Sequence, residues 1–257
     1  MKQSRTTSLF GPLAILLFFC SCTSHYRLAG IERTRIVIDS RYDRTPDAQA
    51  AAFLAPYKQQ VDSVMGPVVG RAACDMAAAR PESTLSNLLP DILMWAASKY
   101  DEQPDFAVQN IGGIRAALSK GVVTYGDVLD VAPFDNKICF ITLTGDKVLE
   151  LFRQIAVRGG EGLSHGVRLV IGSDGQLRSV QLHGKDIDPQ ASYRVATIDY
   201  LAQGNDQLTA FKAGTNLHAP TADNDNTRFV IMDYFRAMQA QGKEVDARVE
   251  GRVVVEK

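Results

Sequence analysis

The order of helix-like and strand-like segments is the feature of this 257-residue chain that most constrains its fold. Apolar residues recur at helical spacing in one set of segments, which predicts helices over 45–65, 82–100, 147–157 and 227–241. Runs of β-branched and other apolar residues predict strands over 35–39, 68–75, 106–109, 137–143, 167–171, 177–182, 193–198 and 247–255. Helices and strands mix without strict alternation, and no internal repeat or low-complexity linker follows residue 30. These features predict a single α+β domain rather than a doubly wound parallel sheet.

Composition and charge place the chain among ordinary globular proteins and exclude several other classes. Hydrophobic residues make up 46% of the chain and charged residues 22%, which excludes a disordered tail, a collagen-like rod and a disulfide-dense mini-protein. The 28 lysines and arginines are balanced by 29 aspartates and glutamates, so the net charge is −1. Binders of duplex nucleic acid usually carry a basic excess. We therefore expect no nucleic acid duplex among the partners.

The N-terminal segment has the pattern of an export signal. Lys2 and Arg5 supply positive charge, and the apolar stretch 9–20 is shorter than the roughly 20 residues of a membrane span. The sequence FCSC over 19–22 resembles a bacterial lipobox, in which Cys22 is lipidated and becomes the new N-terminus. This predicts a lipoprotein signal peptide over 1–22, then a tether, a strand and a lead-in helix over 23–64. An ordinary signal peptide that leaves Cys22 unmodified is the alternative.

The predicted lipid anchor also predicts a location. Acyl chains on Cys22 would hold the mature protein on a membrane, outside the cytoplasm. We expect an exported bacterial lipoprotein on the periplasmic side of a membrane or at the cell surface.

Two of the four cysteines, Cys74 and Cys139, lie beyond the signal segment. In an oxidising compartment these two can pair, whereas a cysteine in an apolar strand such as 137–141 is more often a small buried hydrophobe. The sequence leaves both alternatives open. It has no Cys-x-x-Cys motif, which excludes zinc ribbons and thioredoxin-type redox chemistry.

Motifs of self-contained catalysis are missing from the sequence. It has no Gly-x-Ser-x-Gly elbow, no Gly-x-x-x-x-Gly-Lys-Ser/Thr loop and no His-Glu-x-x-His zinc helix. The four histidines are scattered, without carboxylates at metal-ligand spacing. The acidic segment 223–226 lacks the glycine of a calcium loop, and we interpret it as the cap of the helix from Thr227. The sequence thus predicts no catalytic residue, cofactor or metal site in this chain.

Polar and aromatic residues on glycine-rich loops are the candidate functional groups, in a loop-rich stretch over 110–136 and a second loop over 199–206. They are Arg115 in NIGGIR (110–115), Phe134 and Asn136 in PFDN (133–136), and Tyr200 and Asp206 in DYLAQGND (199–206). Such a set suits a nucleoside, because a base stacks between two rings, a carboxylate accepts ribose hydroxyls and an arginine contacts anionic groups. In the alternative, Phe134 lies in the core, Tyr200 packs at a strand end and Arg115 forms a surface ion pair.

These residues belong to a longer series of motifs that resembles the C-terminal domain of 5′-nucleotidases. The series is RPESTLSNLLPD (80–91), NIGGIR (110–115), GDVLDVAPFDN (126–136), LTGD (143–146) and YLAQGND (200–206), and the resemblance covers about residues 65–255. It implies a mixed α/β/β/α-type domain over 65–257 that supplies a nucleoside-binding pocket. By position it implies a base sandwiched by Phe134 and Tyr200, base-edge contacts from Asn110 and Asn136, a ribose contact from Asp206, and substrate-binding arginines at Arg115 and Arg80.

The sequence departs from the family pattern within the predicted pocket. Arg80 is slightly displaced from the position of the family's arginine. Around Asp206, Asn205 and Gln207 replace glycines of a Gly-Gly-Asp-Gly pattern. Asn205 can adopt the left-handed conformation that a glycine permits, although less easily than glycine, and we expect the loss of glycine at Gln207 to reshape the pocket rim.

The largest departure concerns the phosphatase domain. Full-length relatives carry an N-terminal metallophosphatase domain with Asp-x-His and Gly-Asn-His-Asp/Glu motifs that hold two metals, and this sequence has neither motif. The resemblance therefore implies the nucleotide-recognition component of a split hydrolase, not catalytic alone. Its partner would be a separate metallophosphatase chain that holds the divalent metals. The alternatives are a stand-alone nucleoside- or nucleotide-binding lipoprotein used in scavenging, and a surface interaction module with a degenerate pocket.

Overall fold

The first part of the chain does not form the predicted strand. The computed structural model describes residues 28–41, 44 and 47–256, so the predicted signal peptide with Cys22 and the helix start at 45–46 lie outside the described residues. The strand predicted over 35–39 is wrong, because residues 28–39 have no regular structure. An apolar β-branched run becomes a strand only where a neighbouring strand accepts its hydrogen bonds, and no described strand pairs with this one.

Helix α2 (Ala48–Met65) confirms the helix predicted ahead of Gly66. Its apolar side chains, among them Phe53, Tyr57 and Val61, recur at helical spacing, and all three are exposed. No residue of α2 is buried. The periodicity therefore predicted the helix but not the environment of its apolar face. The chain divides within α2 into two compact units, 1–51 and 52–257.

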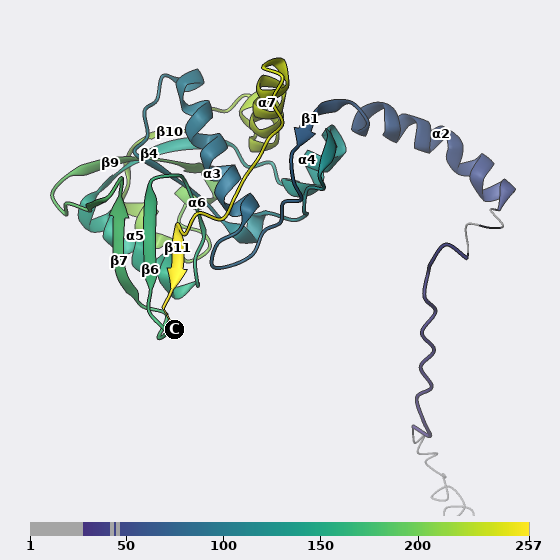
Figure 1. The fold of residues 1–257 in the computed structure, drawn as a ribbon, viewed down its shortest axis with the longest axis horizontal. Helices are drawn as coiled ribbons and strands as arrows, with labels where there is room; N and C mark the ends of the chain where they lie inside the picture. Colours follow the sequence, from purple (N-terminus) through teal and green to yellow (C-terminus); the bar gives the residue numbers. More distant parts are fainter. Residues whose placement is uncertain (1–27, 42–43, 45–46, 257) are drawn as a thin grey trace, which may run out of the picture. The chain divides into compact units, whose positions relative to one another are not determined.

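A central five-stranded sheet organises the second unit (Figure 1). Its order is β10 (Thr215–His218), β4 (Ile138–Thr144), β9 (Ser192–Ile198), β2 (Phe106–Gln109) and β5 (Gly162–Leu163). The middle strand β9 pairs antiparallel with β4 and parallel with β2. A four-stranded sheet has the order β11 (Val253–Val255), β6 (Val167–Ile171), β7 (Leu177–Leu182) and β8 (Lys185–Asp186), and a small antiparallel pair consists of β1 (Val68–Ala72) and β3 (Gly121–Thr124).

The two faces of the central sheet are buried in two different hydrophobic clusters. Side chains alternate along a strand, so Phe140 of β4 belongs to one cluster and the next residue, Ile141, to the other. The first cluster includes residues of α3 (Thr84–Ala96), α4 (Tyr125–Val131) and α7 (Thr227–Ala240). The second includes residues of α5 (Gly145–Val157), α6 (Asp199–Ala202) and the four-stranded sheet. Short 3-10 helices are η2 (Ala97–Tyr100), η3 (Ile111–Gly113), η4 (Thr209–Ala213) and η5 (Asp223–Asp225). This arrangement confirms the predicted α+β class.

Side-chain caps mark where two of the helices begin. Asn226 Oδ1 accepts the backbone N–H of Arg228 at 3.0 Å, which confirms the predicted cap of α7. The prediction that 110–136 is loop-rich is wrong for β3 and α4. Thr124 and Asp127 form a capping box at the start of α4, with each side chain accepting the other's backbone N–H. This Thr-x-x-Asp spacing is the sequence signal for the helix.

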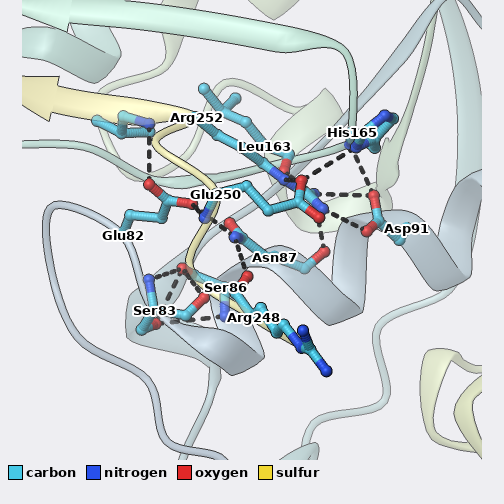
Figure 2. A network of polar contacts seen from close by, with 11 residues as sticks. Glu82, Ser83, Ser86, Asn87, Asp91, Leu163, His165, Arg248, Glu250 and Arg252 are labelled. Carbon is cyan, nitrogen blue, oxygen red and sulfur yellow. Dashed lines mark hydrogen bonds and ion pairs between the residues drawn. The ribbon is translucent and has the colours of Figure 1, made fainter. Parts of the chain in front are cut away.

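A polar cluster around Arg252 shortens the predicted C-terminal strand, which begins at Val253 rather than at 247 (Figure 2). Arg252 is 5% exposed and donates to the two carboxylate oxygens of Asp91 at 2.9 and 2.7 Å. It also donates to Glu250 at 3.0 Å and to the carbonyl oxygen of Leu163 at 2.8 Å. Because Asp91 lies on α3 and Leu163 on β5, one guanidinium joins the C-terminal segment to a helix and to the central sheet.

Both cysteines of the second unit are free thiols. Cys139 is fully buried in β4, and burial raises the pKa of its thiol to about 12. Cys74 is partly buried, with its sulfur 3.4 Å from Asp246 Oδ1. Of the two alternatives left open by the sequence, the structure supports unpaired cysteines.

Candidate functional site

Neighbouring strands bring the candidate loops to one edge of the central sheet. Ile138 at the start of β4 pairs with Ile198 at the end of β9, because these strands are antiparallel. β2 is parallel to β9, so its end lies at the same edge, where Gln109 pairs with Gly162 at the start of β5. The loop after β2, the turn before β4, the helix after β9 and the segment before β5 therefore converge.

The loop after β2 supplies Asn110 and a pair of glycines. Asn110 is buried, and its Nδ2 donates to Asp206 Oδ2 at 2.7 Å. A Cβ at Gly113 would lie 2.7 Å from Asn110 Oδ1, closer than these atoms approach in proteins. Glycine at 113 therefore leaves the room that the Asn110 side chain needs in this orientation.

The turn before β4 supplies Phe134 and Asn136. Arg228 on α7 donates to the carbonyl oxygen of Pro133 at 3.2 Å. The backbone N–H of Thr227 donates to the carbonyl oxygen of Asn136 at 2.9 Å. The first turn of α7 thus fixes the backbone on both sides of Phe134, whose side chain is 46% exposed. This exposure excludes the alternative in which Phe134 is a core residue.

The segment after β9 supplies Tyr200 and Asp206. Tyr200 is 37% exposed, and its hydroxyl donates to Asp206 Oδ1 at 3.1 Å. The left-handed residues are Gly204, Asp206 (φ 54°) and Gln207 (φ 62°), so Asn205 does not use the left-handed conformation that was open to it. Its side-chain amide donates to the carbonyl oxygen of Tyr200 at 2.8 Å, which ties the turn to α6.

These segments line one cavity of about 290 Å³. Its lining residues are Arg80, Asn110, Gly112, Gly113, Phe134, Asn136, Arg158, Tyr200 and Asp206. The cavity brings together all of the sequence-predicted binding residues except Arg115. Arg115 is exposed, and its guanidinium carbon lies 5.9 Å from the centroid of the Phe134 ring, a cation–π distance.

A buried carboxylate holds two arginines at the cavity. The side chain of Glu161 is fully buried, and its Oε1 accepts hydrogen bonds from Arg158 at 2.6 Å and from Arg80 at 2.5 Å. Its Oε2 accepts the backbone N–H of Ile111 at 2.6 Å. Sequence reasoning included Arg80 but missed Arg158 and Glu161. The available signal was the Gly-Gly pair between Arg158 and Glu161, which lies outside the motifs that carry the family resemblance.

Asp206 is the charged group at the centre of the cavity's hydrogen bonds. It accepts from Asn110 and from Tyr200, and NH2 of Arg158 lies 3.6 Å from its Oδ2. The hydrogen bond to Asp206 and the negative charge of this carboxylate raise the pKa of Tyr200. A carboxylate has about four acceptor positions, so Asp206 retains capacity for hydroxyl groups of a ligand.

A second cavity, of about 220 Å³, lies beside the Arg252 cluster and differs in chemistry. Its lining residues are Asn87, Leu88, Asp91, Tyr234, Asp246, Ala247, Arg248, Glu250 and Arg252. Arginines and carboxylates here pair with one another, as Figure 2 shows for Arg252 with Asp91 and Glu250. We therefore interpret this cluster as structural. Across residues 28–41, 44 and 47–256, no group of three or more His, Cys, Asp or Glu side chains could hold a metal ion.

Several known proteins are similar to this chain in sequence or in fold. The family described as "5′-nucleotidase, C-terminal domain" matches residues 68–213. Protein UshA of Escherichia coli is 27% identical over 212 residues, which cover 78% of this chain and 36% of that protein. Cell wall protein Lmo0130 of Listeria monocytogenes is 27% identical over 235 residues, which cover 82% of this chain and 30% of that protein. The crystal structure of a 5′-nucleotidase precursor from Thermus thermophilus has a TM-score of 0.69 and 28% identity, covering 83% of this chain and 44% of that one.

The mixed sheet and the loop-lined cavity at its edge define an α+β domain. Since the family match covers more than half of the chain, the chain belongs to the 5′-nucleotidase C-terminal domain family. This confirms the family resemblance and the fold that it implied. The chain spans about a third of the length of the curated relatives that it matches.

Proposed function

We propose that this chain is the nucleotide-recognition component of a split 5′-nucleotidase-type phosphohydrolase. The observation that carries the proposal is the single cavity at which Phe134, Tyr200 and Asp206 meet. Phe134 comes from the turn before β4 and the other two from the segment after β9, and the two aromatic residues are exposed rather than buried in the core. Membership of the 5′-nucleotidase C-terminal domain family supports the same ligand class.

In this proposal each lining residue has a role that its contacts support. The base stacks between Phe134 and Tyr200, and such stacking is worth about 1–3 kcal/mol per base. Ribose hydroxyls donate to Asp206. Asn136 reads the base edge, whereas the amide of Asn110, which already donates to Asp206, holds that carboxylate in place.

The hydrolytic chemistry belongs to a partner in this proposal. The described residues do not provide a set of ligands that fits a divalent metal, so no chemical step is assigned to this chain. The chain binds the nucleoside and orients its phosphate ester toward a separate metallophosphatase chain. Holding two reactants together in this way lowers the barrier by proximity.

Calorimetry and reconstitution test the proposal together. We expect the purified chain to bind adenosine or AMP, and expect its addition to a metallophosphatase chain encoded nearby to increase the rate of AMP hydrolysis. Phe134→Ala should weaken both the binding and the increase in hydrolysis. Binding without any effect on hydrolysis would favour a stand-alone nucleotide-binding protein for scavenging. Absence of both effects would contradict the proposal and favour an interaction module with a degenerate pocket.

We also propose that Cys22 carries a lipid and anchors the chain outside the cytoplasm. The lipobox-like sequence over 19–22 supports this, and one relative is named a cell wall protein. In the described part of the chain no helix has the length and apolarity to cross a membrane. Cys22→Ala should abolish incorporation of a labelled fatty acid, whereas the matched control Cys20→Ala should retain it. Equal labelling of both variants would contradict the proposal.

A further inference from the structure

We propose that Arg158 selects phosphorylated nucleosides over neutral ones, and that Glu161 is the positioning residue that sets Arg158 and Arg80 as a pair. The inference rests on the proposed function, because it names the chemical group of the nucleotide that this part of the cavity recognises. Neither the sequence motifs nor the family pattern singled out Arg158 or Glu161.

Glu161 is placed to organise this side of the cavity. A fully buried carboxylate is costly unless charged and hydrogen-bonded partners surround it, and Glu161 has two guanidiniums and one backbone N–H. That N–H belongs to Ile111, the residue after Asn110, so one carboxylate fixes both arginines relative to the glycine turn. Rigid placement of a guanidinium reduces the ordering cost of binding an anion.

The backbone beside Glu161 also requires a close approach. Gly160 has φ 105°, and a Cβ there would lie 2.5 Å from the carbonyl oxygen of Pro81. The same close packing lets Arg80 donate its Nε to the carbonyl oxygen of Gly160 at 2.9 Å. The segments that carry the two arginines are therefore held against each other by backbone contacts as well as by Glu161.

Charge and donor geometry identify the group that the arginines suit. One oxygen of Glu161 accepts from both guanidiniums, and Asp206 Oδ2 lies 3.6 Å from NH2 of Arg158, within ion-pair distance but longer than a hydrogen bond. A guanidinium has five N–H donors, and Arg158 uses its Nε on Glu161. Its side chain is 20% exposed and lines the cavity, so its remaining donors are accessible there. Planar, permanently charged donors match the oxygens of a phosphate, which a neutral nucleoside lacks.

Isothermal titration of the full chain with AMP and with adenosine tests the selection. We expect the wild-type chain to bind AMP at least about tenfold more tightly than adenosine. Arg158→Met should lower AMP affinity about tenfold and change adenosine affinity less than about twofold. Arg153→Met is the matched control, because Arg153 lies on α5, the helix that Arg158 caps, is exposed and does not line the cavity. It should change neither affinity.

Glu161→Gln tests the positioning role. Glutamine has the size of glutamate but no charge, and its NH₂ group cannot accept hydrogen bonds from the arginines or from the N–H of Ile111. The preference for AMP over adenosine should therefore fall. Thermal unfolding of the variant checks that the domain is folded. Arg158→Lys, which keeps the charge without the planar fork, should retain part of the preference and tests the site even where Glu161→Gln does not fold.

The outcomes separate the two proposals. Equal losses of AMP and adenosine affinity in Arg158→Met would overturn the inference, because Arg158 would then act through Asp206. An unchanged AMP affinity in this variant would overturn it as well. A wild-type chain that binds AMP and adenosine equally would overturn the inference and leave the proposed function standing. A wild-type chain that binds neither ligand would overturn both.

Discussion

Phe134 and Tyr200 are aromatic residues that stay partly exposed in the folded protein. Substituting them by alanine should therefore affect ligand affinity more than the stability of the domain. They are 46% and 37% exposed, and each lines the 290 Å³ cavity. We expect Phe134→Ala and Tyr200→Ala each to weaken AMP binding by about 1–3 kcal/mol, roughly 5- to 150-fold, in calorimetry. The thermal midpoint of the free protein should change little, because little apolar area leaves the core.

Trp95 provides the matched control for these two rings. It is 39% exposed and stacks edge-on against Tyr234 at 5.2 Å between centroids, but it does not line the cavity. Trp95→Ala should therefore leave AMP affinity unchanged. A comparable loss of affinity in this variant would show that the effect of the aromatic substitutions is not local to the cavity.

The hydroxyl of Tyr200 gives the cavity a titration that NMR can follow. Its hydrogen bond to Asp206, and then the charge of that carboxylate, raise the pKa of Tyr200 above the ordinary value of about 10. The pKa of Tyr200 is higher in the folded than in the unfolded state. The hydrogen bond therefore stabilises the folded state below about pH 10, and this stabilisation disappears as the pH rises through the folded-state pKa. In a tyrosine-labelled sample, Asp206→Asn should move the Tyr200 titration back toward the ordinary value. An unchanged titration would contradict the hydrogen bond.

Among the secondary-structure elements, the join between β11 and α3 depends on one arginine. Arg252 is 5% exposed and donates to Asp91 on α3 (Figure 2). Arg248, four residues earlier, has an 82% exposed side chain that pairs only with Asp246 at the surface. Breaking a buried ion pair costs about 3–5 kcal/mol, and we expect about 2–3 kcal/mol for Arg252→Met because Asp91 is 34% exposed. Arg248→Met should cost less than about 1 kcal/mol.

Urea unfolding of the two variants measures this difference. The midpoint should fall for Arg252→Met with little change in the slope. Equal midpoints for Arg252→Met and Arg248→Met would show that the buried guanidinium does not hold the C-terminal segment to the domain.

The elements that the sequence predicted well are those in which periodicity and length agree. The β6–β7 hairpin and the strand β2 have the predicted bounds, and α5 and α7 differ only at their ends. The seven-residue helix α4 and the two-residue strand β5 are too short for a periodic signal. The strand predicted over 35–39 failed because a strand needs a partner, which local sequence does not reveal.

The candidate site also contains residues that local sequence patterns indicate and residues that they do not. Loop motifs pointed to residues that the fold gathers at one cavity, because glycines and turn residues mark loops locally. The ion pairs of Glu161 with Arg80 and Arg158 were missed, since a buried carboxylate is recognisable only once the segments around 80 and 160 lie together. Long-range packing, rather than any local pattern, creates this part of the cavity.

For the whole molecule, the position of the cavity couples ligand binding to the stability of the domain. Its lining residues extend in sequence from Arg80 to Asp206 and lie at the edge of the sheet whose faces bury both hydrophobic clusters. Unfolding of either cluster would separate residues that the proposed nucleotide would bridge. A ligand that binds only the folded state at 100 times its dissociation constant stabilises that state by about 2.7 kcal/mol.

We therefore expect AMP at that ratio to raise the thermal midpoint by about 5–10 °C, in one cooperative transition, for a domain of this size. Differential scanning calorimetry measures the shift, and its dependence on ligand concentration gives the affinity independently of titration. The Phe134→Ala, Tyr200→Ala double variant should lose the shift while keeping the midpoint of the free protein. A transition that splits in two on adding AMP would show that the two clusters unfold separately, because the ligand would then stabilise only the part that contains its contacts.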